Sequence, residues 1–274
     1  MKSFKVSKEQ IAAFHLDGYL LVRGMFDKEE MDLLITIAKA DREMDKAPGR
    51  KDSKGGVSRL RLRNELYDDI YSACVRCHRI VDTMEALLGD EVYHFHHKMM
   101  LKEPLVGGAW EWHQDYGYWY QNNACLYPDM ASCMIAVDRA TKENGCLQVI
   151  KGSHKLGRVE HGFTGEQTGA NMERVNAALQ RLPLVYCELQ PGDALFFHAN
   201  LLHRSDQNRS QNPRWSLICC YNTKHNDPFK LAPPGGHPNY HYLDRWDDSK
   251  VKEIGKRQLE EMKQQKEPSV AAAK

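Results

Sequence analysis

The sequence predicts an α+β domain in which helices come first and pack on a β-rich core. Before about residue 89, apolar residues recur mostly at helical spacing. From residue 91 onward, short apolar runs alternate with turn signals, as in 92–101, 131–138 and 214–222. Several short strands at this spacing are typical of a β-sandwich or barrel.

The balanced composition narrows the class of protein. The 274 residues include 38 Lys and Arg against 37 Asp and Glu, so a net charge of +1 provides no field that would attract nucleic acid. The chain shows neither a signal-peptide core nor an apolar run of the roughly 18 residues that a membrane span needs. We therefore expect one cytoplasmic domain over residues 1–274, with a small-molecule partner and no nucleic-acid or membrane partner.

Two capping-box patterns mark the starts of N-terminal helices. Ser7 and Asp27 are each followed three residues later by Gln or Glu, the spacing that satisfies the first backbone N–H groups of a helix. The first helix is expected to end near Gly18, where glycine can adopt the left-handed conformation. The run 19–22 predicts a short buried strand.

A third helix is expected over about 67–88, ended by Gly89. Cys74 and Cys77 belong to a C-x-x-C-H pattern typical of haem attachment, but they continue the apolar stripe of this helix, which favours packing. The eight cysteines of the chain are expected to be reduced. The polar segment 46–58, with three glycines and a proline, predicts a mobile loop.

Turn signals divide the second half of the chain. Asn144-Gly145 predicts a hairpin, and 191–193 (PGD) predicts a tight turn. The organisation expected is N-terminal helices at about 7–89, a β-core at about 91–224 with an insertion at about 152–182 that holds a helix near 171–181, and a C-terminal loop and helix at about 226–265.

His113-Gln114-Asp115 is the sharpest candidate for a metal site. Residues two apart on a strand face the same way, so an imidazole and a carboxylate would project together. A second histidine, His198 or His203, would complete the set of two His and one carboxylate typical of non-haem Fe(II) oxygenases. Ser205 and Arg214 follow downstream and could hold the far carboxylate of a 2-oxo diacid by charge-assisted hydrogen bonds.

A set of short motifs stands in order along most of the chain: 11–19 (IAAFHLDGY), 112–115 (WHQD), 143–149 (ENGCLQV), 152–154 (GSH), 191–195 (PGDAL), 202–205 (LHRS) and 213–215 (PRW). In these motifs the sequence resembles the phytanoyl-CoA dioxygenase family of Fe(II)/2-oxoglutarate-dependent oxygenases. Only His203 has Ser205 and Arg214 at the family's spacing, which favours it over His198. Lys151 stands where the family usually has proline, a change that affects a turn rather than the metal.

The resemblance implies a fold, a ligand set and a reaction. The core would be a double-stranded β-helix (jelly-roll) with helices packed on one side. His113, Asp115 and His203 would bind Fe(II), and Arg214 and Ser205 would hold the far carboxylate of 2-oxoglutarate. The enzyme would use O2 to hydroxylate an unactivated C–H bond and release succinate and CO2, with no catalytic side chain beyond the metal ligands.

Further contacts are predicted around this centre. Lys98 and His96 lie on the strand that matches the family's co-substrate strand, and we nominate both for 2-oxoglutarate. The basic runs 59–63 and 96–102 favour a small polar or anionic substrate, although a solvated edge strand explains 59–63 more simply. The residues nominated for substrate contact are Trp119, Tyr118, Arg61 and His154.

Three alternatives stay open. A hydrolase or isomerase on a cupin-like barrel would use the same ligands without 2-oxoglutarate, but it would not need Ser205 and Arg214. A non-catalytic metal- or 2-oxoglutarate-binding module would bind without turnover. A protein hydroxylase would share the cofactors but act on a polypeptide.

Overall fold

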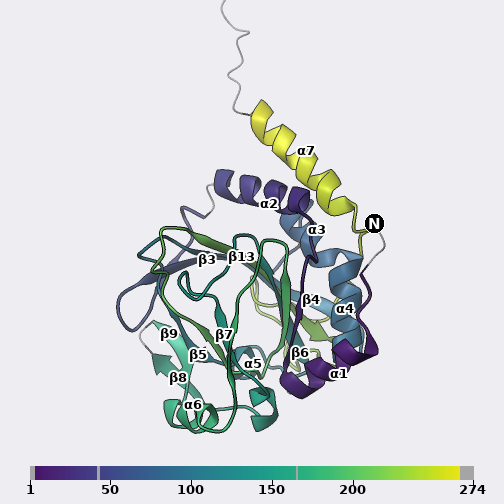
Figure 1. Ribbon diagram of the computed structural model, residues 1–274. Coiled ribbons are helices and arrows are strands. Elements are labelled where there is room, and N and C mark those ends of the chain that lie inside the picture. Colours follow the sequence, from purple (N-terminus) through teal and green to yellow (C-terminus); the bar gives the residue numbers. More distant parts are fainter. Residues whose placement is uncertain (1–3, 42–43, 165, 266–274) are drawn as a thin grey trace, which may run out of the picture.

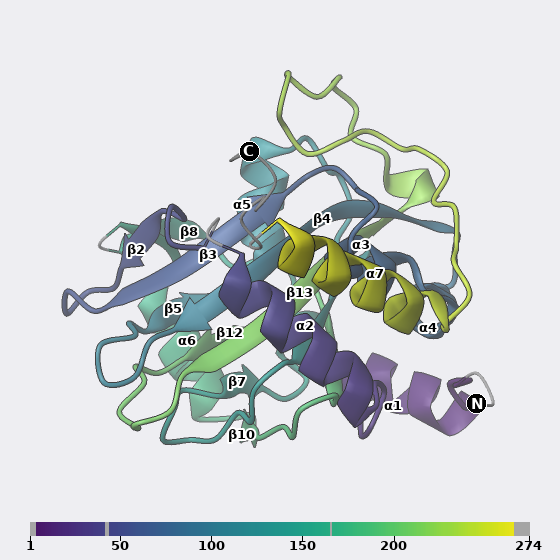
Figure 2. The ribbon, with the colours of Figure 1, turned by 90° about the horizontal axis from the view of Figure 1, so that it is seen from above.

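In this computed structural model, two β-sheets face each other and most helices cover one of them (Figure 1 and, from above, Figure 2). The structure describes residues 4–41, 44–164 and 166–265. The larger sheet has seven strands in the order β1-β11-β6-β13-β4-β3-β2, and the smaller has four in the order β10-β7-β12-β5. These two sheets form the predicted jelly-roll core. A separate two-stranded sheet, β8-β9, lies beside the smaller sheet.

The helices and strands have the following bounds. The helices are α1 (Lys8–Asp17), α2 (Lys28–Ala40), α3 (Ile70–Arg76), α4 (His78–Leu88), α5 (Asp115–Asn122), α6 (Met172–Leu179) and α7 (Lys250–Gln264). The strands are β1 (Tyr19–Val22), β2 (Gly49–Lys51), β3 (Val57–Arg63), β4 (Val92–Lys102), β5 (Trp110–His113), β6 (Met130–Ala136), β7 (Leu147–Ile150), β8 (His161–Thr164), β9 (Gln167–Ala170), β10 (Leu184–Cys187), β11 (Ala194–His198), β12 (His203–Ser205) and β13 (Arg214–Thr223).

Both predicted capping boxes are present. The Ser7 side chain accepts a hydrogen bond from the backbone N–H of Gln10, and Asp27 accepts one from that of Glu30. Gly18 ends α1 with φ of 83°, in the left-handed region. These signals are local, so they fix the helix boundaries without help from distant parts of the chain.

The predicted helix over 67–88 is broken in two, which corrects that expectation. Cys77 is extended, with φ of −70° and ψ of 146°, and separates α3 from α4. The backbone N–H of His78 donates to the carbonyl of Trp246, and the N–H of Trp246 donates to Arg76. A segment distant in sequence therefore takes the hydrogen bonds that a continuous helix would have used.

Two further expectations for loops were wrong. The segment 46–58, predicted as a mobile loop, contributes β2 and the start of β3, which pair as an antiparallel hairpin. Asn144-Gly145 forms a turn, but it joins β6 to β7, which belong to different sheets. It is therefore a crossover between the two sheets and not the predicted hairpin.

Two apolar clusters share the larger sheet. Along β13, Leu217 and Cys219 face α2, α3 and α4, whereas Ile218 and Cys220 face the smaller sheet. All eight cysteines are free and buried, as expected of packing residues. No helix in the described ranges is long and apolar enough to cross a membrane. The space between the sheets holds the polar residues of the site.

A buried ion pair ties α2 to α4. The Nη2 atom of Arg79 lies 2.5 Å from Oε1 of Glu30, and both side chains are almost fully buried. The variant Arg79→Leu leaves the Glu30 carboxylate buried without its partner, so we expect the free energy of unfolding to fall by about 3–5 kcal/mol. Urea unfolding measures this loss, and the double variant Arg79→Leu/Glu30→Gln is expected to recover part of it. An unchanged midpoint for Arg79→Leu would contradict the assignment.

Candidate active site

Three ligand-type side chains meet where the smaller sheet faces the larger one. His113 is the last residue of β5, Asp115 is the first residue of α5, and His203 begins β12. His203 pairs with His113 across the antiparallel strands. The predicted reason for the His113–Asp115 proximity was incomplete, because the chain leaves the strand at Gln114 and Asp115 already lies on a helix.

The three side chains are close enough to share one metal ion. One ligand atom from each lies within 4.8 Å of the others. Oδ1 of Asp115 is 3.7 Å from Nε2 of His113 and 3.9 Å from Nε2 of His203. The remaining ring nitrogens are used elsewhere: Nδ1 of His113 bonds the carbonyl of Glu111, and Nδ1 of His203 bonds that of Leu201. These bonds fix the tautomers that leave both Nε2 atoms free to bind a metal.

The charge states of the three side chains also suit a divalent metal. Burial lowers the pKa of His113 and His203, so both imidazoles stay neutral. Burial alone would raise the pKa of Asp115, but the Lys98 ammonium and a Ser132 hydrogen bond hold it below its usual value. The Ser132 hydroxyl donates to Oδ2 at 3.0 Å, which leaves Oδ1 turned toward the imidazoles.

Gln114 holds the turn between the two ligands of the motif. Its amide nitrogen donates to the carbonyls of Gly157 and Asn200, and its Oε1 accepts the N–H of Val159. Its own backbone N–H donates to Nε2 of His161. These bonds connect the strand-to-helix junction to the insertion, so the insertion positions the metal ligands.

An inner cavity extends from the triad toward Arg214. Counted with its opening to solvent, it has an empty volume of about 420 Å³, and it is lined by Lys98, Ser205 and Arg214 as well as the triad. Arg214 is buried, and its Nη1 donates to the carbonyl of Gly145 at 2.6 Å. Its Nε atom has no partner, and no carboxylate in the described ranges pairs with the guanidinium. Burial lowers the pKa of Arg214 to about 10, so the group stays charged at neutral pH.

A buried unpaired cation is costly unless a ligand neutralises it. The inner cavity therefore has the chemistry of a site for a dianion that reaches both the metal and Arg214. Lys102 is buried on the opposing strand, but its ammonium already donates to the carbonyls of Gly108, Ser205 and Asp206. Lys102 thus holds the backbone of Ser205 in place, which leaves Arg214 for the ligand.

An outer cavity continues from the triad toward solvent. Its empty volume, with the open mouth, is about 1120 Å³. Lys98 and the metal ligands His113 and Asp115 line both cavities, whereas His96 lines only the outer one. The other residues that line it are Arg50, Leu60, Leu62, Trp110, Gln114, Tyr118, Trp119, His161, Phe163, Glu166, Gln167, Thr168 and His237.

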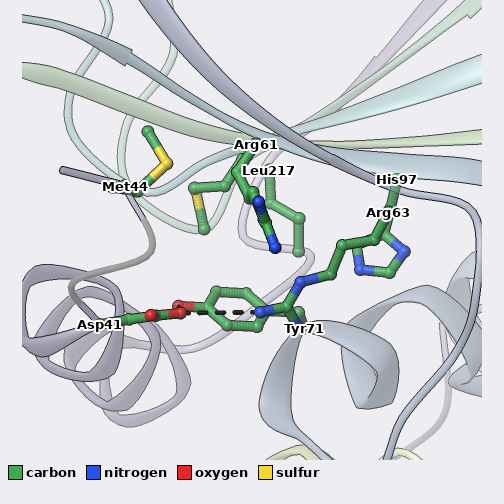
Figure 3. Close-up of a pocket in the computed structure, with 8 residues that line it drawn as sticks. Asp41, Met44, Arg61, Arg63, Tyr71, His97 and Leu217 are labelled. Carbon is green, nitrogen blue, oxygen red and sulfur yellow. Dashed lines mark hydrogen bonds and ion pairs between the residues drawn. The ribbon is translucent and has the colours of Figure 1, made fainter. Parts of the chain in front are cut away.

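The structure brings some of the nominated substrate residues to this cavity and not others. Trp119 and Tyr118 line it, from α5. Arg61 does not, because β3 turns Leu60 and Leu62 toward the metal and Arg61 toward the helices. It lies instead with Tyr71 and His97 in a separate small cavity on the other side of the sheet (Figure 3). The alternative of a solvated edge strand holds only in part. β2 pairs with residues 57–59, so residues 60–63 pair only with β4 among the described strands, but Arg61 and Arg63 line the small cavity.

Two histidines considered for the site lie outside it. His154 is on a 3-10 turn, where its Nε2 lies 3.1 Å from the carbonyl of His15. His198, the rival metal ligand, accepts the N–H of Asn200 and packs beside His154. Both face α1 and not the triad, which leaves His203 as the second histidine.

Sequence reasoning missed several residues of the site. Gln114 was visible inside the motif, but its bonds to the insertion were not. Ser132 and His237 gave no signal, since one lies in an apolar strand and the other in a loop rich in Pro and Gly. Lys102 was noticed as basic, although its bonds to three carbonyls depend on the fold.

The comparisons with known proteins agree with this geometry. The sequence profile described as Phytanoyl-CoA dioxygenase (PhyH) matches residues 14–216. The chain belongs to the phytanoyl-CoA dioxygenase family. An L-proline trans-4-hydroxylase from Streptomyces griseoviridis is 30% identical over an alignment of 184 residues that covers 61% of this chain and 69% of that protein. An ectoine dioxygenase from Sphingopyxis alaskensis is 26% identical over an alignment of 256 residues that covers 84% of this chain and 81% of that protein.

Solved structures support the same fold. EctD from S. alaskensis, crystallised with 2-oxoglutarate and 5-hydroxyectoine, superposes with a TM-score of 0.71 at 24% identity over 88% of each chain. The epimerase SnoN, crystallised with Fe3+ and alpha ketoglutarate, gives 0.68 at 22% identity over 88% of this chain and 97% of SnoN. The predicted jelly-roll is thereby confirmed. Family membership, together with the triad, confirms the predicted 2-oxoglutarate-dependent dioxygenase with iron as its metal.

Proposed function

We propose that this member of the phytanoyl-CoA dioxygenase family hydroxylates an unactivated C–H bond of a small polar or anionic molecule and releases succinate and CO2. The observation that carries the proposal is the buried Arg214 guanidinium, unpaired with any carboxylate of the described residues, in the same cavity as the His113–Asp115–His203 triad. A dianionic 2-oxo acid fits between them, because its two ends match the metal and the cation.

Each part of the site has a role in this reaction. Iron, held by the triad, supplies the chemistry that couples oxygen to decarboxylation of the 2-oxo acid. Arg214 fixes the far carboxylate of 2-oxoglutarate, with Ser205 beside it on β12. Lys98 stands at the junction of the two cavities, where its charge faces Asp115. The apolar residues Met134 and Ile218 line the inner cavity and exclude water.

The outer cavity supports a small polar substrate. Lys98 and His96 contribute donors to it, while Leu60, Leu62 and Trp119 give it an apolar wall. The related proteins are named for proline and ectoine, both small polar molecules. A cupin-like hydrolase or isomerase would bind the metal with the same ligands, but it would have no use for an unpaired Arg214.

Anaerobic spectroscopy tests the proposal. Adding Fe(II) and then 2-oxoglutarate to the metal-free protein is expected to produce the weak visible charge-transfer band of a chelated 2-oxo acid. Under air, small polar molecules such as L-proline and ectoine are then screened for stimulated succinate release and a hydroxylated product. If Fe(II) binds and no band forms, the proposal fails and the hydrolase or sensor alternative takes its place.

A further inference from the structure

We propose that the substrate is a carboxylate, and that His96, stacked on His237, holds that carboxylate in the outer cavity together with Lys98. This inference rests on the proposed function and names the substrate class for the same site. It moves His96 from the predicted 2-oxoglutarate site to the substrate site.

His96 is a buried side chain with unmet hydrogen-bonding capacity. It is only 2% exposed, and neither of its ring nitrogens has a partner. Its ring stacks on that of His237, with centroids 4.5 Å apart and planes 26° apart, and it meets the edge of Trp119. Leaving such polar atoms unpaired costs free energy, so their presence in the wall of a cavity points to a ligand that pairs with them.

The position of His96 assigns it to substrate and not to 2-oxoglutarate. His96 and His237 line the outer cavity, whereas Arg214 and Ser205 line the inner one. Lys98, two residues after His96 on β4, lines both, and it has no hydrogen bond or ion pair with the described residues. A substrate group held between His96 and Lys98 would therefore lie beside the metal and outside the 2-oxo acid.

His237 comes from a part of the chain that the family profile does not match, since the match ends at residue 216. It is held in place by Asn64, whose Oδ1 lies 2.7 Å from Nδ1 of His237 and whose amide donates to the carbonyl of Gly235. Its Nε2 atom has no partner among the described residues. Because Nδ1 of the neutral ring donates to Asn64, Nε2 is a hydrogen-bond acceptor and does not donate to a carboxylate. The loop between β13 and α7 thus brings to the cavity the ring on which His96 stacks.

The charge of this part of the cavity suits a singly charged group. Burial lowers the pKa of His237 to about 4 and that of His96 well below its usual value, so both rings are neutral hydrogen-bonding groups at neutral pH. Lys98 then supplies a positive charge deep in the outer cavity. At the rim, the exposed Arg50 and Glu166 carry opposite charges that balance each other. One ammonium with the N–H donor of neutral His96 matches a carboxylate better than a phosphate dianion.

Paired ligands test this inference with two variants. Small carboxylic acids and their primary amides, beginning with L-proline and L-prolinamide, are titrated anaerobically into protein saturated with Fe(II) and 2-oxoglutarate. The shift of the visible band gives each dissociation constant without turnover. Wild-type protein is expected to bind at least one acid at least about tenfold more tightly than its amide, as a hydrogen-bonded charge would require.

The variants His96→Phe and His237→Phe keep an aromatic ring in the stack and remove its nitrogens. His96→Phe is expected to weaken acid binding by roughly tenfold, with the amide unaffected and the 2-oxoglutarate band retained as proof of an intact inner site. His237→Phe, which keeps the ring that stacks on His96, is expected to weaken acid binding much less. His154→Phe, at a histidine outside both cavities, is the matched control and should match wild type.

Equal binding of acids and amides by the wild type, or an equal loss of acid and amide binding in His96→Phe, would overturn the carboxylate assignment. The visible band, if it still forms, would leave the dioxygenase assignment standing. Tighter binding of phosphate monoesters than of acids would overturn it in favour of a different oxyanion. Loss of the band in His96→Phe but not in His237→Phe would return His96 to the 2-oxoglutarate site. If wild type forms no band, the proposed function fails and this inference falls with it.

Discussion

Replacing Asp115 by alanine is expected to abolish hydroxylation while the fold stays intact. The variant removes the only carboxylate of the triad, leaving two neutral imidazoles that bind Fe(II) weakly. Removing a residue that hydrogen-bonds to a metal ligand already lowers metal affinity or activity by roughly 10- to 100-fold. Loss of the ligand itself should therefore lower turnover by more than about 100-fold. Product formation and equilibrium dialysis of Fe(II) measure the two effects.

The fold of this variant should survive because little depends on the Asp115 side chain. Its hydrogen bond comes from the Ser132 hydroxyl, which also lies 3.2 Å from the Cys220 thiol. The melting temperature is therefore the control for misfolding, and Asp32→Ala, at an exposed carboxylate on α2, is the control for loss of a negative charge. Turnover by Asp115→Ala at the wild-type rate would refute the metal assignment.

The parts of the molecule that were predictable depend on short-range signals. The capping boxes at Ser7 and Asp27 predicted their helices because both partners lie within one turn. The cluster of His113, Asp115 and His203 was predictable because two of these residues share a three-residue motif, and the family's spacing of Ser205 and Arg214 favoured His203. The break at Cys77 was not predictable, since it depends on a pairing with Trp246 that only the folded chain creates.

The errors at the site have a related physical origin. Arg61 and Leu60 alternate along β3, and the sequence does not tell which of the two faces the metal; pairing of Leu60 with Met100 on β4 decides it. A bulge beside Phe95 similarly turns His94 toward His97, away from the face that His96 shares with Lys98. The face of the sheet on which a side chain lies depends on how its strand is paired with its neighbours, and that pairing is set only in the folded chain.

Replacing Arg214 by alanine is expected to raise the KM for 2-oxoglutarate far more than the KM for the substrate. The guanidinium is buried at the end of the inner cavity, and the outer cavity does not include it. A charge-assisted bidentate contact to a carboxylate is lost, so the KM for 2-oxoglutarate should rise by roughly 100-fold or more. Initial rates of succinate release, with each reactant varied in turn, separate the two constants.

The co-substrate itself supplies the control for Arg214. In wild type, 2-oxobutyrate lacks the far carboxylate and should be a poor replacement for 2-oxoglutarate. In Arg214→Ala this preference should largely disappear, because the partner of that carboxylate is gone. Added guanidinium ion, which fits the space that the side chain leaves, should restore part of the preference. If the KM values for both reactants rise equally and the melting temperature falls, the variant has misfolded. If the preference for 2-oxoglutarate persists in a folded variant, another cation holds the far carboxylate, and Arg214 is only the partner of the Gly145 carbonyl.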